Sequence, residues 1–351
     1  MIKTRCIDLF CGAGGLTCGL LRSGINVKAG IDLDPTCAFV YEKNNKAKFL
    51  LGDIKNYPSS KLEKYWRGGN VKILVGCAPC QPFSRMKKNK ESTIDSKWGL
   101  LYAFLDKVRQ LNPDIVSMEN VPEIRRSEVF ADFVNGLKEL GYHVSYQVVN
   151  AMDYGVPERR SRIILLASRY GDIALSDAAR VDCRVSVRDI IGNLPPIKAG
   201  GTCENDPLHT ARKLSPINLE RIRLSTPGGT WLDWPFELRP VCYRKKTGAS
   251  FSAVYGRMKW DDVAPTLTTQ FDVYGTGRYG HPVQDRALSL REGALLQSFP
   301  FSYDFIDPSV PFSRNTIARQ IGNAVPPALG YAIGISIKEH LKGHIDLIRA
   351  A

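Results

Sequence analysis

The chain has 351 residues, of which 44% are hydrophobic, and this is enough to bury a large core in two domains. Basic residues outnumber acidic ones by 48 to 35, and the resulting net charge of +13 predicts a polyanionic partner, either nucleic acid or an anionic membrane surface. The sequence has no apparent membrane span or signal peptide, and its nine irregularly spaced cysteines are typical of reduced thiols, so a soluble, cytoplasmic protein is expected.

The N-terminal segment has the order strand, glycine-rich turn and helix. Residues 5–10 are predicted to form a strand, Gly12 and Gly14 lie in the turn, and a helix is expected to end near residue 24. This order brings a backbone close to a nucleotide-like ligand. The pattern G-x-G-x-x-G is incomplete because Thr17 occupies the third glycine's place, so an ordinary tight turn explains the segment equally well.

Two carboxylates follow the next predicted strands. The strand at 27–31 is followed by Asp32, and the strand at 49–51 by Gly52 and Asp53. A carboxylate after the second strand suits a ribose diol. Because these loops share one edge of a parallel sheet with the glycine-rich turn, the sequence indicates an adenosine-type ligand.

The stretch from 71 to 84 combines a buried strand, at 71–76, with a stiff loop that contains Cys77, Cys80 and two prolines. Two cysteines at this spacing are compatible with a buried apolar pair, a redox pair or half a zinc site. No second Cys-x-x-Cys and no histidine pair follows, so no metal site is predicted. A single nucleophilic cysteine is the remaining possibility, and the rest of the sequence has to decide it. Cys77, which directly follows the buried strand, is expected to be a small core residue.

The next part of the chain continues the alternation of helices and strands. Helices are predicted at 98–111 and 130–140, and strands at 114–118, 144–149 and 163–167. Glu119 is either a solvated strand end or a partner of Cys80 at the same edge. Arg160 and Arg162, which enter the last strand, belong either to a solvated face or to a clamp for an anion or carbonyl.

From about residue 186 the sequence changes character. Prolines and glycines become frequent, and basic residues alternate with aromatic ones between residues 239 and 260. This mixture suits phosphate contacts and base reading from loops, although an irregular subdomain without that role is equally compatible with it. Helices are predicted again at 291–299 and 328–341.

Taken together, the motifs resemble the cytosine-C5 DNA methyltransferases of the bacterial modification-enzyme type, in the family's order and along nearly the whole chain. Two departures are Ala78, where the family often has Gly or Pro, and Glu158, where it usually has Gln. The residues that carry the resemblance lie at 8–15, 79–84, 119–121, 154–162, 291–300 and 320–326.

The resemblance implies a fold and a division into domains. The fold is an α/β, doubly wound, Rossmann-like methyltransferase domain with a smaller, irregular target-recognition domain. Residues 1–185, completed by 318–351, would form the catalytic and cofactor-binding domain, and 186–317 the target-recognition domain. The cofactor would be S-adenosylmethionine, which leaves as S-adenosylhomocysteine.

The resemblance also implies roles for individual residues. Cys80 would add to C6 of a flipped-out cytosine, Glu119 would contact N3 and the amino group, Arg162 would hold O2 and Arg160 would support the site. Phe10 would pack on adenine, Asp32 would bind the ribose and Asp53 the adenine amino group. The cofactor pocket would also contain Gly12, Gly14, Ile54, Pro79, Asn323 and Val325. Expected DNA contacts are Gln81, Ser84, Arg85, Lys87, Lys88, Arg244, Lys245 and Arg257.

The implied activity is methyl transfer to C5 of cytosine within a specific duplex DNA sequence, either in a restriction-modification system or by an orphan modification enzyme. A monomer is expected, without a stable complex with any cognate restriction endonuclease. Three alternatives stay open. A tRNA methyltransferase of the same family would carry a Cys-Phe-Thr signature in the later region, and this sequence has none. A catalytically silent family member would lack Cys80, Glu119 or Arg162, and all three are present. An NAD-dependent oxidoreductase would leave the Pro79–Cys80–Gln81 segment unexplained.

Overall fold

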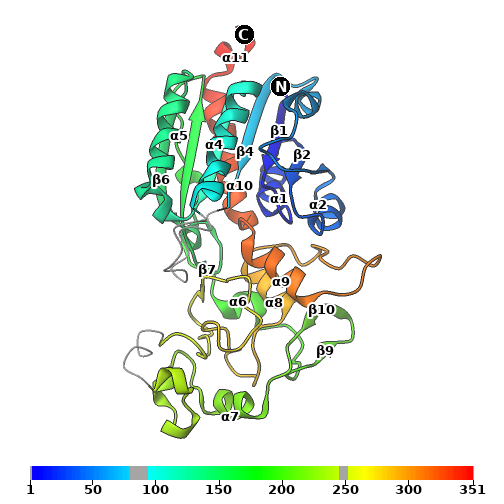
Figure 1. Cartoon of the computed structure of the whole chain (residues 1–351), viewed down its shortest axis with the longest axis vertical. Helices are drawn as coiled ribbons and strands as arrows, with labels where there is room; N and C mark the ends of the chain where they lie inside the picture. Colours follow the sequence, from blue (N-terminus) through cyan, green and yellow to red (C-terminus); the bar gives the residue numbers. More distant parts are fainter. Residues whose placement is uncertain (1, 80–93, 245–251, 351) are drawn as a thin grey trace. The chain divides into compact units, whose positions relative to one another are not determined.

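The computed structural model describes residues 2–79, 94–244 and 252–350, which divide into two compact units (Figure 1). The first unit comprises Met1–Tyr154, Ser161–Asp182 and Ala324–Ala351, and the second comprises Gly155–Arg160 and Cys183–Asn323. These bounds differ from the expected domains at 155–160, 183–185 and 318–323, which all belong to the second unit. In the first of these segments, β7 (Glu158–Arg159) pairs with β11 (Ala264–Pro265) of the second unit. A separate function for each unit remains a proposal.

A seven-stranded sheet forms the centre of the first unit. Its strand order is β3-β2-β1-β4-β5-β8-β6, and β8 alone runs opposite to the other six strands. The order reverses between β1 and β4, and the carboxyl ends at such a reversal are where doubly wound folds bind ligands. The strands are β1 (Thr4–Leu9), β2 (Val27–Asp32), β3 (Lys48–Leu51), β4 (Val71–Gly76), β5 (Ile115–Asn120), β6 (His143–Asn150) and β8 (Ser161–Ser168).

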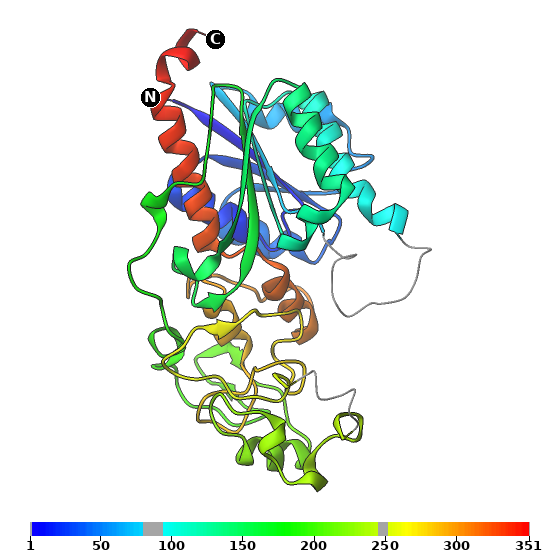
Figure 2. The same cartoon turned by 90° about the vertical axis from the view of Figure 1, so that its left-hand side faces the viewer.

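Helices cover both faces of this sheet (Figure 2). Successive residues of a strand point to opposite faces, so β1 contributes Ile7 to one core and Cys6 to the other. Phe104 and Phe133 lie in the first core and Leu329 in the second. The helices are α1 (Gly15–Ser23), α2 (Cys37–Asn45), α3 (Ser59–Glu63), α4 (Ile94–Leu111), α5 (Glu128–Glu139), α10 (Pro327–Gly343) and α11 (Ile345–Ala350). The expected doubly wound α/β fold is confirmed.

The C-terminal helix α10 completes the first unit by packing against α1. A Cβ atom added at Gly19 of α1 would lie 2.1 Å from the carbonyl oxygen of Pro327. Only glycine permits this approach, because real Cβ atoms do not come so close to backbone atoms. The helix that follows the glycine-rich turn is therefore held against the end of the chain. No helix in the described ranges is both long and apolar enough to cross a membrane.

The second unit has few regular elements. Two short strands pair antiparallel, and three single turns of 3-10 helix follow between residues 231 and 243. The elements are α6 (Val187–Ile191), β9 (Thr202–Cys203), β10 (Asp206–Thr210), α7 (Pro216–Leu224), α8 (Leu290–Leu296) and α9 (Arg314–Asn323).

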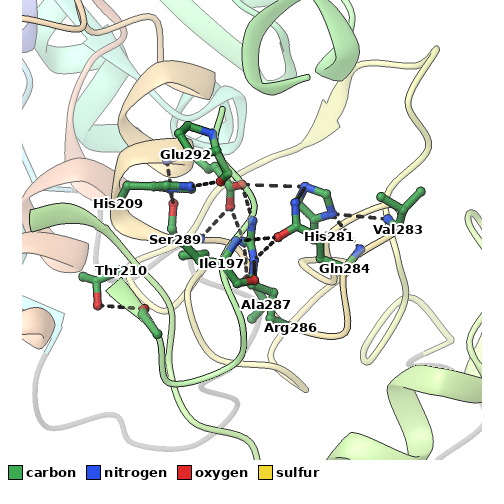
Figure 3. Close-up of polar contacts among 12 residues, drawn as sticks. Ile197, His209, Thr210, His281, Val283, Gln284, Arg286, Ala287, Ser289 and Glu292 are labelled. Carbon is green, nitrogen blue, oxygen red and sulfur yellow. Dashed lines mark hydrogen bonds and ion pairs between the residues drawn. The ribbon is translucent and has the colours of Figure 1, made fainter. Parts of the chain in front are cut away.

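A group of polar side chains is buried in this unit (Figure 3). Ser289 and Glu292 form a capping box at the start of α8, in which the Glu292 carboxylate accepts the Ser289 N–H at 2.7 Å. The fully buried Arg286 guanidinium donates two further bonds of 2.7 Å to this carboxylate. His209 Nδ1 lies 2.8 Å from Ser289 Oγ. A hydrogen-bonded network, rather than apolar contacts alone, thus holds α8 in place.

Candidate active site

The turn between β1 and α1 has an unusual backbone. Phe10 has φ 58°, a conformation uncommon for a bulky residue, and Gly12 and Gly14 have φ 51° and 87°. The half-buried Phe10 ring packs against the core beside Phe104, with 6.5 Å between ring centroids. Among the described residues, a Cβ atom added at Gly12 would meet nothing within 4 Å. The turn therefore leaves room beside its backbone for a ligand.

Asp32, at the end of β2, is bonded to this turn. Its Oδ2 accepts the Gly12 N–H at 2.8 Å, and its Oδ1 accepts the Asp34 N–H at 2.9 Å. Burial raises the pKa of Asp32, while these two N–H groups oppose the rise. The carboxylate is partly exposed and retains acceptor capacity for a diol.

A second carboxyl near the turn, Asp8 of β1, is fully buried and was not among the predicted site residues. The hydroxyl of Thr17 donates to its Oδ2 at 2.7 Å, and the Tyr41 hydroxyl lies 2.9 Å from Thr17. Burial raises the pKa of Asp8 to about 7, the Thr17 bond opposes this, and the charge of Asp32 adds to it. The strand pattern could have identified it, since Asp8 interrupts an otherwise apolar run.

The loop after β3 carries Asp53 and Ile54. Asp53 Oδ1 accepts the Lys55 N–H at 3.0 Å, and the Asp53 carbonyl accepts the N–H groups of Asn56 and Tyr57. Ile54 is buried in the same core that Phe10 contacts. An apolar surface flanked by carboxylates at two strand ends fits an adenosine moiety, so these residues suit S-adenosylmethionine.

Glu119 forms the centre of a polar cluster at the end of β5. It is only 2% exposed, and its Oε1 lies 3.0 Å from Nε of Arg162 on β8. Its Oε2 accepts a hydrogen bond of 2.7 Å from the Cys77 thiol. Glu119 is therefore a buried, paired carboxylate and not a solvated strand end.

The structure also corrects the expectation for Cys77. This residue is half-buried and contacts Glu119, whereas the sequence indicated a small core residue. The reason is the parallel pairing of β4 with β5, in which Gly76 lies opposite Met118. Cys77 directly follows Gly76, and Glu119 directly follows Met118, so the two side chains meet.

Arg160 and Arg162 belong to different units. Arg160 is buried in the second unit, where its Nη1 donates to Glu158 Oε1 and to the Leu267 carbonyl, both at 3.2 Å. Glu158 is fully buried and also accepts the Leu267 N–H at 2.7 Å. The glutamate that departs from the family pattern therefore forms an ion pair with Arg160.

The remaining predicted residues have varied environments. Pro79 and Asn323 are exposed, and Val325 is buried against the core that contains α1. Arg244 is exposed, but it stacks on Phe236 and donates to the carbonyls of Arg239 and Glu237. Outside the described residues lie Cys80, Gln81, Ser84, Arg85, Lys87, Lys88 and Lys245.

Arg257, a predicted DNA contact, is only 4% exposed. Its guanidinium donates to the carbonyls of four residues of its own unit and pairs with the Asp285 carboxylate. The carbonyls belong to Ile222, Ser225, His281 and Gln284. We therefore propose a structural role for Arg257 in place of a DNA contact.

This fold and these strand-end residues define a class of doubly wound enzymes that use a nucleoside-type cofactor. Residues 4–339 match the family model described as C-5 cytosine-specific DNA methylase. The chain belongs to this family and is an S-adenosylmethionine-dependent DNA cytosine-5 methyltransferase, as its sequence motifs indicated.

Similar proteins span nearly the whole chain. The type II methylase M.HgiDII of Herpetosiphon aurantiacus is 51% identical over 341 residues, which are 96% of this chain and 96% of that protein. The type II methyltransferase M1.HphI of Haemophilus parahaemolyticus is 30% identical over 94% of this chain and 86% of its own. The crystal structure of S. pombe Dnmt2 methyltransferase has the same fold, with a TM-score of 0.62 at 17% identity over 96% of this chain and 99% of that one.

Proposed function

We propose that this enzyme methylates C5 of a flipped-out cytosine within a specific duplex DNA sequence, through a covalent bond between Cys80 and C6. The observation that carries the proposal is the buried Glu119–Arg162 pair, at the strand ends adjacent to the cofactor-type loops. A base must leave the duplex to reach such groups.

The proposed chemistry assigns a step to each side chain. The Cys80 thiolate adds to C6, the π electrons of the C5–C6 bond shift through C4 towards N3, and C5 becomes the nucleophilic carbon of an enamine. Glu119 bonds to the N3 edge and stabilises the proton that N3 gains. Arg162 holds O2 and keeps Glu119 in place. After C5 has gained the methyl group, loss of its proton releases the bond between sulfur and C6 and restores Cys80.

The proposed cofactor residues are Phe10, Gly12, Gly14, Asp32, Asp53, Ile54, Pro79, Asn323 and Val325. When bound, S-adenosylmethionine supplies an electrophilic methyl group. Phe10 and Ile54 would contact the adenine ring, and Asp32 and Asp53 would accept hydrogen bonds from the ribose hydroxyls and the adenine amino group. The placement of Phe10, Asp32, Asp53 and Ile54 at the ends of β1, β2 and β3 supports their assignment.

The second unit is proposed to recognise the target sequence. Between residues 230 and 244 three single turns expose Leu232, Phe236 and Val241 beside Arg244, and a basic, partly apolar surface suits contacts with phosphates and base edges. A role in a restriction-modification system, a monomeric state and a cytoplasmic location remain proposals that rest on the sequence and on the type II relatives.

The proposed covalent step can be tested with duplex DNA that carries 5-fluorocytosine at the target. Fluorine leaves no proton to eliminate at C5, so enzyme and DNA should stay linked through a denaturing gel in the presence of S-adenosylmethionine. Cys80→Ser should abolish the adduct, whereas Cys183→Ser, at an exposed cysteine of the second unit, should retain it. Parallel incubation with tRNA that carries 5-fluorocytidine tests the substrate class. An adduct that survives Cys80→Ser, or forms only with tRNA, would overturn the proposal.

A further inference from the structure

Cys77 and Arg162 contact Glu119 from the two strands that flank β5. The Cys77 thiol follows β4 and lies 2.7 Å from Glu119 Oε2, while Arg162 Nε on β8 lies 3.0 Å from Oε1. The two carboxylate oxygens thus have different partners, which come from opposite sides of β5. Rotation of the Glu119 carboxylate about the Cγ–Cδ bond would break both contacts.

The backbone around Cys77 is itself held at both ends. The Cys77 N–H donates to the Leu9 carbonyl of β1 at 3.3 Å, and the Ala78 carbonyl accepts a bond of 3.0 Å from the Asn120 side chain. Asn120 directly follows Glu119 on β5. The thiol is therefore presented to Glu119 from a backbone that is anchored to both neighbouring strands.

Arg162 alone would restrain only one side of the carboxylate. Its Nε lies 3.0 Å from Oε1, and its Nη1 donates to the Ser161 carbonyl at 2.7 Å. A carboxylate that only the ion pair at Oε1 restrains can still swing, whereas the added hydrogen bond at Oε2 fixes the edge that it presents to the base. Each carboxylate oxygen can accept a further bond, so Cys77 does not block the cytosine.

We propose that Cys77 is a positioning residue for methyl transfer, because its thiol fixes the Glu119 carboxylate in the orientation that bonds to cytosine. The inference rests on the proposed function of Glu119. It differs from a role in apolar packing, which predicts that loss of the thiol changes stability and leaves the methyl-transfer rate unchanged.

The test measures single-turnover methyl transfer, with enzyme in excess over a duplex whose methylated cytosine has been located by bisulfite sequencing. Loss of one hydrogen bond to a charged group predicts that Cys77→Ala slows the reaction about tenfold. The KM for S-adenosylmethionine should not change. Cys77→Ser supplies a hydroxyl donor and should restore the rate to within about threefold.

A double-mutant cycle with Glu119→Gln separates positioning from packing. If Cys77 acts through Glu119, Cys77→Ala should slow the Glu119→Gln enzyme by less than about twofold. The matched control is Cys6→Ala, since Cys6 lies in the same apolar cluster as Cys77 but is fully buried in β1. This control should lower the unfolding temperature and retain the rate.

The outcomes distinguish two kinds of failure. If Cys77→Ala retains the wild-type rate, or slows the Glu119→Gln enzyme as much as the wild type, the positioning role is refuted. A folded Glu119→Gln enzyme with the wild-type rate would instead refute the proposed function of Glu119. Thermal unfolding of each variant shows whether a lost rate reflects a lost fold.

Discussion

The buried His281 of the second unit should make the free energy of unfolding depend on pH. Its Nδ1 accepts the backbone N–H groups of Val283 at 3.2 Å and Gln284 at 3.0 Å, which favours a neutral ring. Burial lowers the pKa of His281 to about 4, the charge of Glu292 opposes this, and those of Arg286, Arg257 and His209 add to it.

The direction of the effect on stability follows from proton binding. An unfolded histidine is protonated below about pH 6.5, whereas folded His281 stays neutral down to about pH 4. The unfolded state therefore binds more protons in this window, and the free energy of unfolding falls as the pH is lowered through it. A difference of about 2.5 pH units, at 1.36 kcal/mol each, predicts a loss of about 3 kcal/mol.

The assay compares the wild type with His281→Asn in urea unfolding at several pH values between 6.5 and 4. The asparagine oxygen can accept the same two N–H groups but does not titrate. Trp260, whose ring centroid lies 5.2 Å from that of His281, reports unfolding of this region by fluorescence. The wild-type free energy should fall more steeply than that of the variant, by about 1.4 kcal/mol per pH unit. Parallel curves would refute the reasoning.

Two further predictions concern the cofactor loops. Asp32→Ala should weaken S-adenosylmethionine binding by about 1–3 kcal/mol, and unchanged affinity in calorimetry would remove Asp32 from the site. Lys107, 5% exposed on α4, donates to the Tyr57 carbonyl at 2.6 Å and so anchors the loop that carries Asp53. Lys107→Met should therefore raise the KM for S-adenosylmethionine several-fold, whereas Lys61→Met, at an exposed lysine, should leave it unchanged.

The sequence predicted the first unit well because strands such as β4 and β8 contain apolar, buried runs that end in turns. The expected strand at 71–76 coincides with β4, and the helix expected at 98–111 begins earlier, at Ile94. By contrast, α2 was missed, because its C-terminal half, Glu42–Asn45, is polar and lacks a clear apolar period. Local patterns therefore sufficed where one face of an element is uniformly buried.

The contact between Cys77 and Glu119 was missed for a different reason. An apolar run identifies β4 and β5 separately, but the register between them depends on atoms 42 residues apart. Long-range contacts also decide the environments of Arg160 and Arg162, which are two residues apart and were expected to enter the same strand. The chain passes between units there, so their partners could not be inferred from spacing.

The second unit shows why counting basic residues overestimates a DNA-binding surface. In the first unit the sheet satisfies the backbone carbonyls, but irregular loops need other donors. Arginines supply them in the second unit, and several are buried against carbonyls or carboxylates: Arg160, Arg221, Arg257, Arg286 and Arg291. Part of the count of 48 basic residues is therefore internal, and four of these five arginines pair with carboxylates. Phosphate contacts are better sought among exposed lysines and arginines than among basic residues that merely alternate with aromatic ones.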